Sequence, residues 1–213
     1  MKKAAELFTE DQKEKIRQAV TEAEARSTGE IVPVVIDQSG HYLQFPLTGA
    51  ILITFLTALL VAVLRSHTSA VQLLLLELVT FWICFKVIER TDRLWAWLIP
   101  DSLKEKAVAR RAEEAFYEHR LHETKDKTGV LIFLSLLEHR VHLLADTGIH
   151  KKVPAQTWDN LVRQITSEMK EGRSFEALHE AVGACGRLLA EHFPKNSDDT
   201  DELSNELRIE PLS

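Results

Sequence analysis

Two long apolar runs in the middle of the chain constrain its fold more than any other feature of the sequence. Leu47 to Leu64 contains no charged side chain, and a second run, from Ala70 to about Ile88, is interrupted only by Gln72, Glu77, Thr80 and Lys86. As a helix, the first run is about 27 Å long, close to the roughly 30 Å hydrocarbon core of a bilayer. The sequence therefore predicts a water-soluble domain with a transmembrane helical hairpin inserted in its middle.

The charges around this hairpin predict where the protein lies. Two crossings of the membrane leave both soluble parts on the same side. The loop between the runs carries only Arg65 and His67, whereas the other side is more basic, with Lys86, Arg90, Arg93, Lys104 and Lys106. The positive-inside rule then places the soluble domain in the cytoplasm, and the bacterial inner membrane is the simplest setting. Charged residues soon follow Met1-Lys2-Lys3, so we expect no signal peptide.

Charge and cysteine content exclude two further classes of protein. A net charge of -6 argues against a nucleic-acid surface, and no basic stripe occurs outside the flanks of the hairpin. Cys84 and Cys185 are far apart, and Cys84 falls within the second apolar run, so we expect no structural disulfide.

Hydrophobic periodicity predicts the first helix and three strands of the soluble part. A capping box at Thr9–Gln12 begins the helix, and Gly29 ends it. The strand Ile31–Ile36 follows, and we expect it at a sheet edge or locally irregular because Pro33 has no N–H to donate. The runs Val130–Leu136 and Arg140–Ala145 are joined so tightly that they predict a β-hairpin.

Further helices and a polar tail complete the soluble part. A second capping box at Ser102 begins a helix that lasts to about Glu123, and Trp158 to Met169 is an apolar stripe at helical spacing. The stripe from Phe175 to Phe193 predicts the last helix, with Ser174 as its cap. The chain then divides into four parts. Residues 1–45 and 100–194 are the first and second parts of the domain, and residues 46–99 are the hairpin, with spans at about 47–64 and 70–88 and an interfacial segment. Residues 195–213 are an acidic tail that we expect to be disordered. Helices packed on at least three strands make a small α/β sandwich split by the hairpin.

This order of elements, with its particular turns, resembles the TPM-domain family, in the variety whose domain is split by membrane spans. The matching motifs are Thr28–Ile31, Lys127–Ile132, Ala145–Gly148, Trp158 and Leu188–Pro194. The resemblance implies an α/β/α sandwich. It also implies the acid-phosphatase activity of some plant members, which are thylakoid-lumen proteins, and the binding of a divalent cation, Ca²⁺ or Mg²⁺, by acidic loops. Many members work outside the cytoplasm, which is not the location expected for this chain.

Carboxylates at predicted strand ends are the candidate metal ligands. Asp146 follows a strand directly, and we expect it at the carboxyl edge of the sheet, where ligands bind in α/β folds. Glu30, Asp37 and Asp126 are the other candidates, and at least two of the four must converge to hold a cation. The alternative for Asp146 is a turn residue that bonds its own backbone.

Two histidines and a serine are weaker candidates for a functional site. His119 and His122 could face one side of a helix, but a solvated helix face explains them better than zinc, since no zinc motif accompanies them. Ser135 stands in mid-strand without the motif of a nucleophilic serine.

Glu77 is the most informative single charge because a carboxyl group near the middle of a bilayer costs about 2.5–3.5 kcal/mol on insertion scales. Counting from the ends of the loop places Thr57 at a similar depth on the other span. A Glu77–Thr57 hydrogen bond that locks the hairpin and a contact with the transmembrane helix of a partner are both compatible with the sequence.

The function that these observations favour is an interaction or assembly factor held at the inner membrane. Its partners are the lipid bilayer and another membrane protein or a second copy of itself, and not nucleic acid. The alternative is a divalent-metal-dependent phosphatase with Asp146 among its ligands. The sequence contains no catalytic motif, so this alternative depends on the family resemblance.

Overall fold

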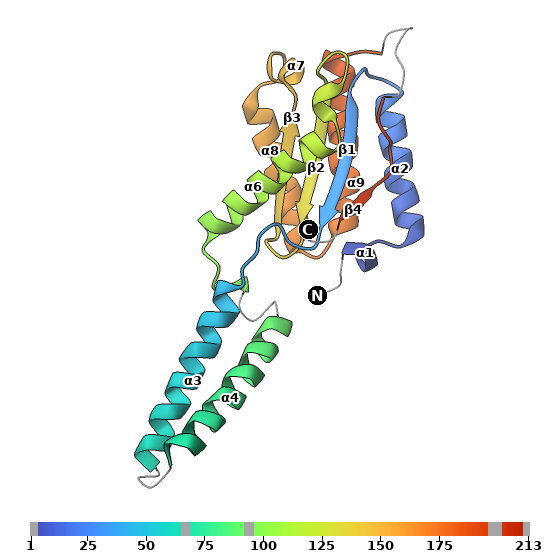
Figure 1. The fold of residues 1–213 in the computed structure, drawn as a ribbon. Helices are drawn as coiled ribbons and strands as arrows, with labels where there is room; N and C mark the ends of the chain where they lie inside the picture. The colour runs from blue at the N-terminus through green and yellow to red at the C-terminus, as the bar shows by residue number, and fades with distance from the viewer. Residues whose placement is uncertain (1–3, 65–68, 92–95, 196–201, 211–213) are drawn as a thin grey trace. The chain divides into compact units, whose positions relative to one another are not determined.

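The computed structural model of the chain describes residues 4–64, 69–91, 96–195 and 202–210. It divides into a helical unit over residues 41–103 and an α/β unit that combines residues 2–40 with residues 104–213. The α/β unit is thus assembled from segments on either side of the helical unit in the sequence (Figure 1). The expectations for Arg65, His67 and Arg93 fall outside the described residues.

A four-stranded sheet in the order β3-β2-β1-β4 is the centre of the α/β unit. β1 (Glu30–Ile36) pairs in parallel with β2 (Gly129–Ser135), and β2 pairs antiparallel with β3 (Arg140–Ala145). The predicted β-hairpin is therefore confirmed. β1 and β2 are buried along their whole length, which is typical of parallel strands covered on both faces.

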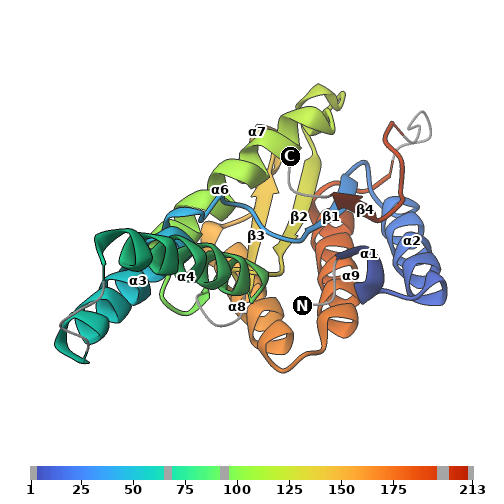
Figure 2. The ribbon, with the colours of Figure 1, turned by 60° about the horizontal axis from the view of Figure 1, so that its bottom comes forward.

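Helices cover both faces of this sheet (Figures 1 and 2). α2 (Glu10–Glu24), α8 (Ala155–Lys170) and α9 (Ser174–His192) lie on one face, and α6 (Asp101–Glu118) lies on the other. Alternate residues of β1 supply the two cores: Ile31 and Val35 pack toward the first group, and Val32 and Val34 pack with side chains of α6. This arrangement confirms the α/β/α sandwich. The short elements are α1 (Ala4–Leu7), η1 (Leu121–Glu123) and α7 (Thr147–His150).

β4 (Arg208–Glu210) corrects two predictions. It lies in the tail that we expected to be disordered, and residues 202–210 are ordered because β4 pairs in parallel with Val34–Ile36. The same pairing makes β1 an inner strand at Val34–Ile36, so its expected place at an edge is wrong for this half of the strand. Pro33 is tolerated because the pairing with β4 begins one residue after it.

Helix ends show which capping signals were interpreted correctly. The first capping box is confirmed, since the Gln12 backbone N–H donates to Thr9 Oγ1 at 3.2 Å and the Thr9 N–H donates to Gln12 Oε1 at 3.0 Å. The expected caps at Ser102 and Ser174 are wrong, because both residues lie inside their helices. α6 ends at Glu118, before the predicted Glu123.

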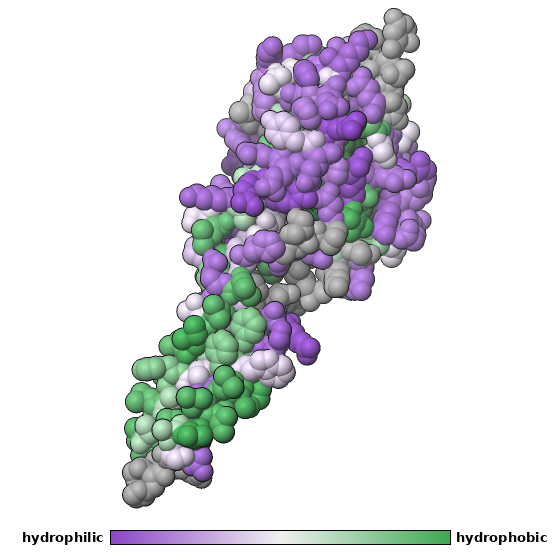
Figure 3. All heavy atoms as spheres, viewed as in Figure 1, coloured by the Kyte–Doolittle hydropathy of each residue, from purple (hydrophilic) through white to green (hydrophobic). Residues whose placement is uncertain are grey.

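The helical unit consists mainly of α3 (Gln44–Leu64) and α4 (Ala70–Arg90), which pack along each other. Each helix has 21 residues and is therefore about 31 Å long. Pro46 and Ala50 are the buried residues of α3, and none of the residues of α4 is buried. Figure 3 shows the resulting concentration of apolar side chains over these two helices. Both are long and apolar enough to cross a membrane.

Candidate functional site

The acidic candidates divide between the two ends of the sheet. β1 and β2 begin at Glu30 and Gly129, and β3 runs in the opposite direction and ends at Ala145. Asp146 therefore lies at the amino edge of the parallel strands. Our expectation that it lies at their carboxyl edge is wrong, because β3 is the returning strand of the predicted β-hairpin and therefore ends where β1 and β2 begin.

Asp146 caps the short helix α7. Its Oδ1 accepts a hydrogen bond from the backbone N–H of Thr147 at 2.6 Å and another from the Thr147 hydroxyl at 3.1 Å. This is the turn geometry that we considered as the alternative to metal binding. The residue is only 8% exposed, and its Oδ2 is buried with no hydrogen-bond partner in the described parts of the chain. One oxygen thus has a structural role as the cap of α7.

Glu30 lies at the same edge as Asp146. It stands opposite Gly129, and the backbone N–H of Asp146 donates to the carbonyl of Gly129 at 2.9 Å. Two strand spacings therefore separate the backbones of Glu30 and Asp146, about 10 Å. Glu30 Oε1 accepts a hydrogen bond from the backbone N–H of Glu202 at 3.1 Å, so it holds the segment that leads to β4.

Asp37 lies at the other end of β1. A strand rises about 3.3 Å per residue, so about 23 Å along β1 separates Asp37 from Glu30. Asp37 Oδ1 accepts a hydrogen bond from the backbone N–H of Ala4 at 2.5 Å. Asp37 and Asp146 therefore cannot bind the same cation.

Asp126 lies in the turn before β2, and its side chain is exposed. A Cβ atom on Gly148 would stand 2.6 Å from the carbonyl oxygens of Asp126 and Lys127, so only glycine allows this turn and α7 to approach so closely. Beside them is a cavity of about 420 Å³ whose lining includes Lys151 and Lys152. Within the described residues, no group of three His, Cys, Asp or Glu side chains is placed to hold a metal ion.

The two histidines considered for zinc do not form a pair on one helix face. α6 ends at Glu118, and Arg120 has a left-handed φ of 59°. His119 Nε2 lies 2.7 Å from Glu210 Oε1, whereas the ring of His122 packs against Tyr117. The left-handed residue between them sends the two side chains to different partners.

A buried network that the sequence did not reveal lies at the carboxyl edge of β1 and β2. Ser39 Oγ donates to Ser135 Oγ at 2.7 Å, the Ser135 hydroxyl donates to the Glu138 carboxylate, and the Ser39 N–H donates to Glu138 Oε1 at 3.0 Å. Ser135 is fully buried. The network ties the chain to the β2–β3 turn shortly before the helical unit begins. Ser135 is the last residue of β2, where we expected a mid-strand position, and the network explains it without invoking nucleophilic catalysis.

In the helical unit, Thr57 and Glu77 are joined by a hydrogen bond. Thr57 Oγ1 lies 2.9 Å from Glu77 Oε2, and it also lies 2.8 Å from the carbonyl oxygen of Thr54. Glu77 Oε1 is buried and has no hydrogen-bond partner among the residues that the structure describes. Glu77 also lines a shallow groove between α3 and α4, together with Ala58 and Leu74.

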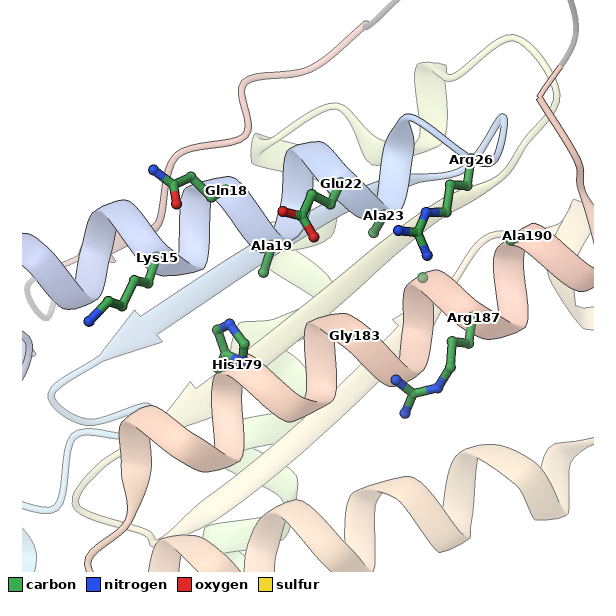
Figure 4. Close-up of a pocket in the computed structure, with 11 residues that line it drawn as sticks. Lys15, Gln18, Ala19, Glu22, Ala23, Arg26, His179, Gly183, Arg187 and Ala190 are labelled. Carbon is green, nitrogen blue, oxygen red and sulfur yellow. The ribbon is translucent and has the colours of Figure 1, made fainter.

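A further groove, of about 440 Å³, lies between α2 and α9 (Figure 4). The two helices approach so closely that a Cβ atom on Gly186 would stand 2.5 Å from the Cβ of Ala23. Arg26, just after the end of α2, reaches toward α9. The groove is also lined by Lys15, His179, Arg187 and one acidic residue, Glu22. This excess of cations favours anionic groups over cationic ones.

Fold and site together define a class of protein, an α/β/α sandwich interrupted by a pair of apolar helices. The family model described as the TPM domain matches residues 89–188. The resemblance that the sequence motifs indicated is thus confirmed.

Comparison with solved structures agrees with this assignment. The NMR structure of the BA42 protein from the psychrophilic bacterium Bizionia argentinensis sp. nov. superposes with a TM-score of 0.62 at 21% identity, over 99% of this chain and 100% of that one. At this identity the likeness shows the fold alone. A comparison with curated proteins finds no match.

Proposed function

We propose that this chain is a TPM-domain protein anchored in a membrane by α3 and α4, and that it acts there through contacts with other proteins. The observation that carries the proposal is the exposed apolar surface of these helices. Phe55, Leu74 and Trp82 are each more than 60% exposed, and many neighbouring side chains are similarly open. Soluble proteins rarely expose apolar patches beyond a few hundred Å². A bilayer is the environment that removes this cost.

The charges near the helices support the proposed location. Lys86 forms a 2.7 Å ion pair with Glu89 near the end of α4, and Arg90 follows directly. Lys104 and Lys106 lie in the early part of α6. Basic residues at this end favour an inner-membrane protein whose α/β unit faces the cytoplasm.

Glu77 supports the proposed contact with another membrane-embedded helix. Hydrocarbon offers no hydrogen-bond donor to its buried Oε1, and polar groups in spans commonly mediate helix association. A hydroxyl or amide donor on a neighbouring transmembrane helix, from another protein or from a second copy, would satisfy this atom once the Glu77 side chain turns toward the groove that it lines. The groove beside Glu77 provides space for such a helix.

Fractionation tests the anchoring. The full chain should stay in the membrane pellet after alkaline carbonate washing, and a variant with residues 44–90 replaced by a flexible linker should move to the supernatant. Recovery of the full chain in the carbonate supernatant would refute the anchoring.

Cross-linking in the membrane tests the contact. A photoreactive residue at Ala58, in the groove beside Glu77, should give an adduct that Glu77→Leu abolishes. The matched control is the same residue at Val63, which is 75% exposed on α3. An adduct at Ala58 that persists in Glu77→Leu would contradict the role of the carboxyl group.

The second candidate function is a divalent-metal-dependent phosphatase that uses Ca²⁺ or Mg²⁺. The buried Asp146 Oδ2 supports it, since a carboxylate oxygen without a partner suits a hard cation. Glu30 and Asp126 are the further candidate ligands at this edge.

Two substitutions separate metal binding from capping. Asn is as good a helix cap as Asp but lacks the charge. If Asp146 binds metal, Asp146→Asn and Asp146→Ala should both abolish saturable Ca²⁺ or Mg²⁺ binding by the full chain in detergent. If it only caps α7, no saturable binding should occur, and Ala alone should lower the stability, by about 1 kcal/mol. Hydrolysis of a phosphomonoester by the same preparations tests the activity itself.

A further inference from the structure

Residues 202–210 lie on the α/β unit like a bound peptide. None of them is buried, although the strand β1 against which they lie is buried throughout. The segment contributes three residue pairs to the sheet through β4, whereas β2 pairs with β1 over its seven residues. β1 is therefore paired along its whole length with β2 on one side, whereas on the other side the segment pairs with only three of its residues.

Specific contacts fix the first half of the segment. The Glu202 N–H donates to Glu30 Oε1, and Glu202 Oε2 accepts a hydrogen bond from the Lys125 N–H, both at 3.1 Å. Asn205 Nδ2 donates to Thr21 Oγ1 at 3.1 Å. The segment is thus held in one register by polar groups of the body of the unit.

The carboxylate of Glu210 lies in a binding site formed by Arg111 and His119, which we call the carboxylate receptor. Arg111 Nη2 donates to Glu210 Oε2 at 2.5 Å, and His119 Nε2 lies 2.7 Å from Oε1. The side chain of Arg111 is only 9% exposed, and it also forms an ion pair with Glu118, whose side chain is 56% exposed. A buried guanidinium group needs carboxylate partners, and this one receives the less exposed of the two from a segment 99 positions away in the sequence.

Side-chain alternation in the segment defines what the site recognises. Leu207 and Ile209 pack against the core that faces α2 and α9, and Glu210 meets Arg111 on the α6 side. An extended peptide with apolar residues two positions apart, followed directly by a glutamate, would make the same contacts. Addition of a strand to a sheet edge is a common mode of peptide recognition.

We propose that the edge of β1 at Val34–Ile36, together with Arg111 and His119, is a binding site for an extended acidic peptide. Residues 202–210 occupy this site in the structure, and a partner segment of the same pattern takes it by displacing them. The site lies wholly in the α/β unit, so it does not depend on the proposed role of α3 and α4. The protein can thus exchange residues 202–210 for the segment of a partner.

An exchange experiment on the full chain tests this proposal. A protease recognition sequence replaces residues 196–201, and the chain is cleaved after it has folded in detergent. A fluorescent peptide of residues 202–213 is then added in excess, and its anisotropy is measured. It should bind the cleaved protein, and bind the uncleaved protein at least a hundredfold more weakly, because the attached segment competes at high effective concentration.

Peptide variants test the carboxylate receptor. A Glu210→Gln peptide should bind at least tenfold more weakly than the unmodified peptide. The matched control is Glu206→Gln, which makes the same change at an exposed residue of the same segment. Equal binding of the unmodified and Glu210→Gln peptides would overturn the proposal.

The other outcomes are also decisive. If the cleaved segment never exchanges with excess peptide, it is a permanent part of the sheet and the proposal fails. If its release abolishes the near-ultraviolet circular dichroism of the α/β unit, it belongs to the folding core and the proposal fails as well. Exchange with retention of that signal, together with the loss in the Glu210→Gln peptide, supports it.

Discussion

Substitution of Glu210 by Gln should destabilise the α/β unit measurably. The carboxylate accepts charge-assisted hydrogen bonds from Arg111 and His119, and Arg111 is nearly buried. Such bonds contribute roughly 1.5–3 kcal/mol each, but the amide of Gln keeps one acceptor and the Glu210 side chain is 19% exposed. We therefore expect a loss of about 2 kcal/mol, or a fall of about 4–8 °C in Tm.

The effect should depend on pH in a defined direction. The hydrogen bond with His119, and then the nearby charge of Arg111, lower the pKa of Glu210 below the ordinary 4.5, although burial opposes the shift. A carboxyl group with a lowered folded-state pKa stabilises the fold above its unfolded-state pKa and loses that contribution as pH falls through the folded-state value. The difference between wild type and Glu210→Gln should thus be full at pH 7 and shrink below about pH 4.5.

Urea denaturation of the full chain in detergent, followed by circular dichroism, measures this difference. Glu206→Gln is the control and should change the stability by less than about 0.5 kcal/mol, as is usual for surface substitutions. A Glu210→Gln variant as stable as this control, or a difference that grows toward low pH, would refute the reasoning.

Two further substitutions test the packing within each unit. Thr57→Val removes the donor to Glu77 and should weaken the association of α3 with α4 by about 0.6–1.7 kcal/mol, as measured by titration with a denaturing detergent. Gly186→Ala would place a Cβ 2.5 Å from that of Ala23 and should cost about 1–3 kcal/mol in thermal denaturation. Gly183→Ala is its control, since the atom nearest to the added Cβ is 3.5 Å away. This control should stabilise α9 by up to about 1 kcal/mol. A comparable loss of stability in both variants would contradict the close packing of α2 and α9.

Local signals in the sequence predicted most of the fold. The β2–β3 hairpin, the first capping box and both apolar helices follow from patterns within a few residues of each other, so they could be predicted without knowledge of the tertiary structure. β4 could not, because three residues of mixed polarity, Arg208–Glu210, carry no periodicity. The position of Asp146 was missed for a different reason: the predicted hairpin already reverses β3, but the edge at which β3 ends was not worked out from it.

Among the polar contacts too, some could be predicted from the sequence and others depend on the tertiary structure. Thr57 and Glu77 could be matched by counting from the loop, because two helices that pack along each other as a hairpin have one simple geometry. Arg111 and Glu210 are 99 positions apart in the sequence, and no sequence pattern predicts that they meet in the folded protein. The network of Ser39, Ser135 and Glu138 likewise exists only where two strand ends meet.

The position of Trp82 relative to lipid tests the central claim most directly. Trp82 is 63% exposed and lies about 18 Å along α4 from Ala70, whereas Trp158 is buried in the α/β unit. Single-tryptophan variants are reconstituted into bilayers whose acyl chains carry bromine, which quenches indole fluorescence on contact. If α3 and α4 form an inserted transmembrane hairpin, Trp82 should be strongly quenched and Trp158 should not. Equal fluorescence of Trp82 in brominated and ordinary lipid would contradict membrane insertion.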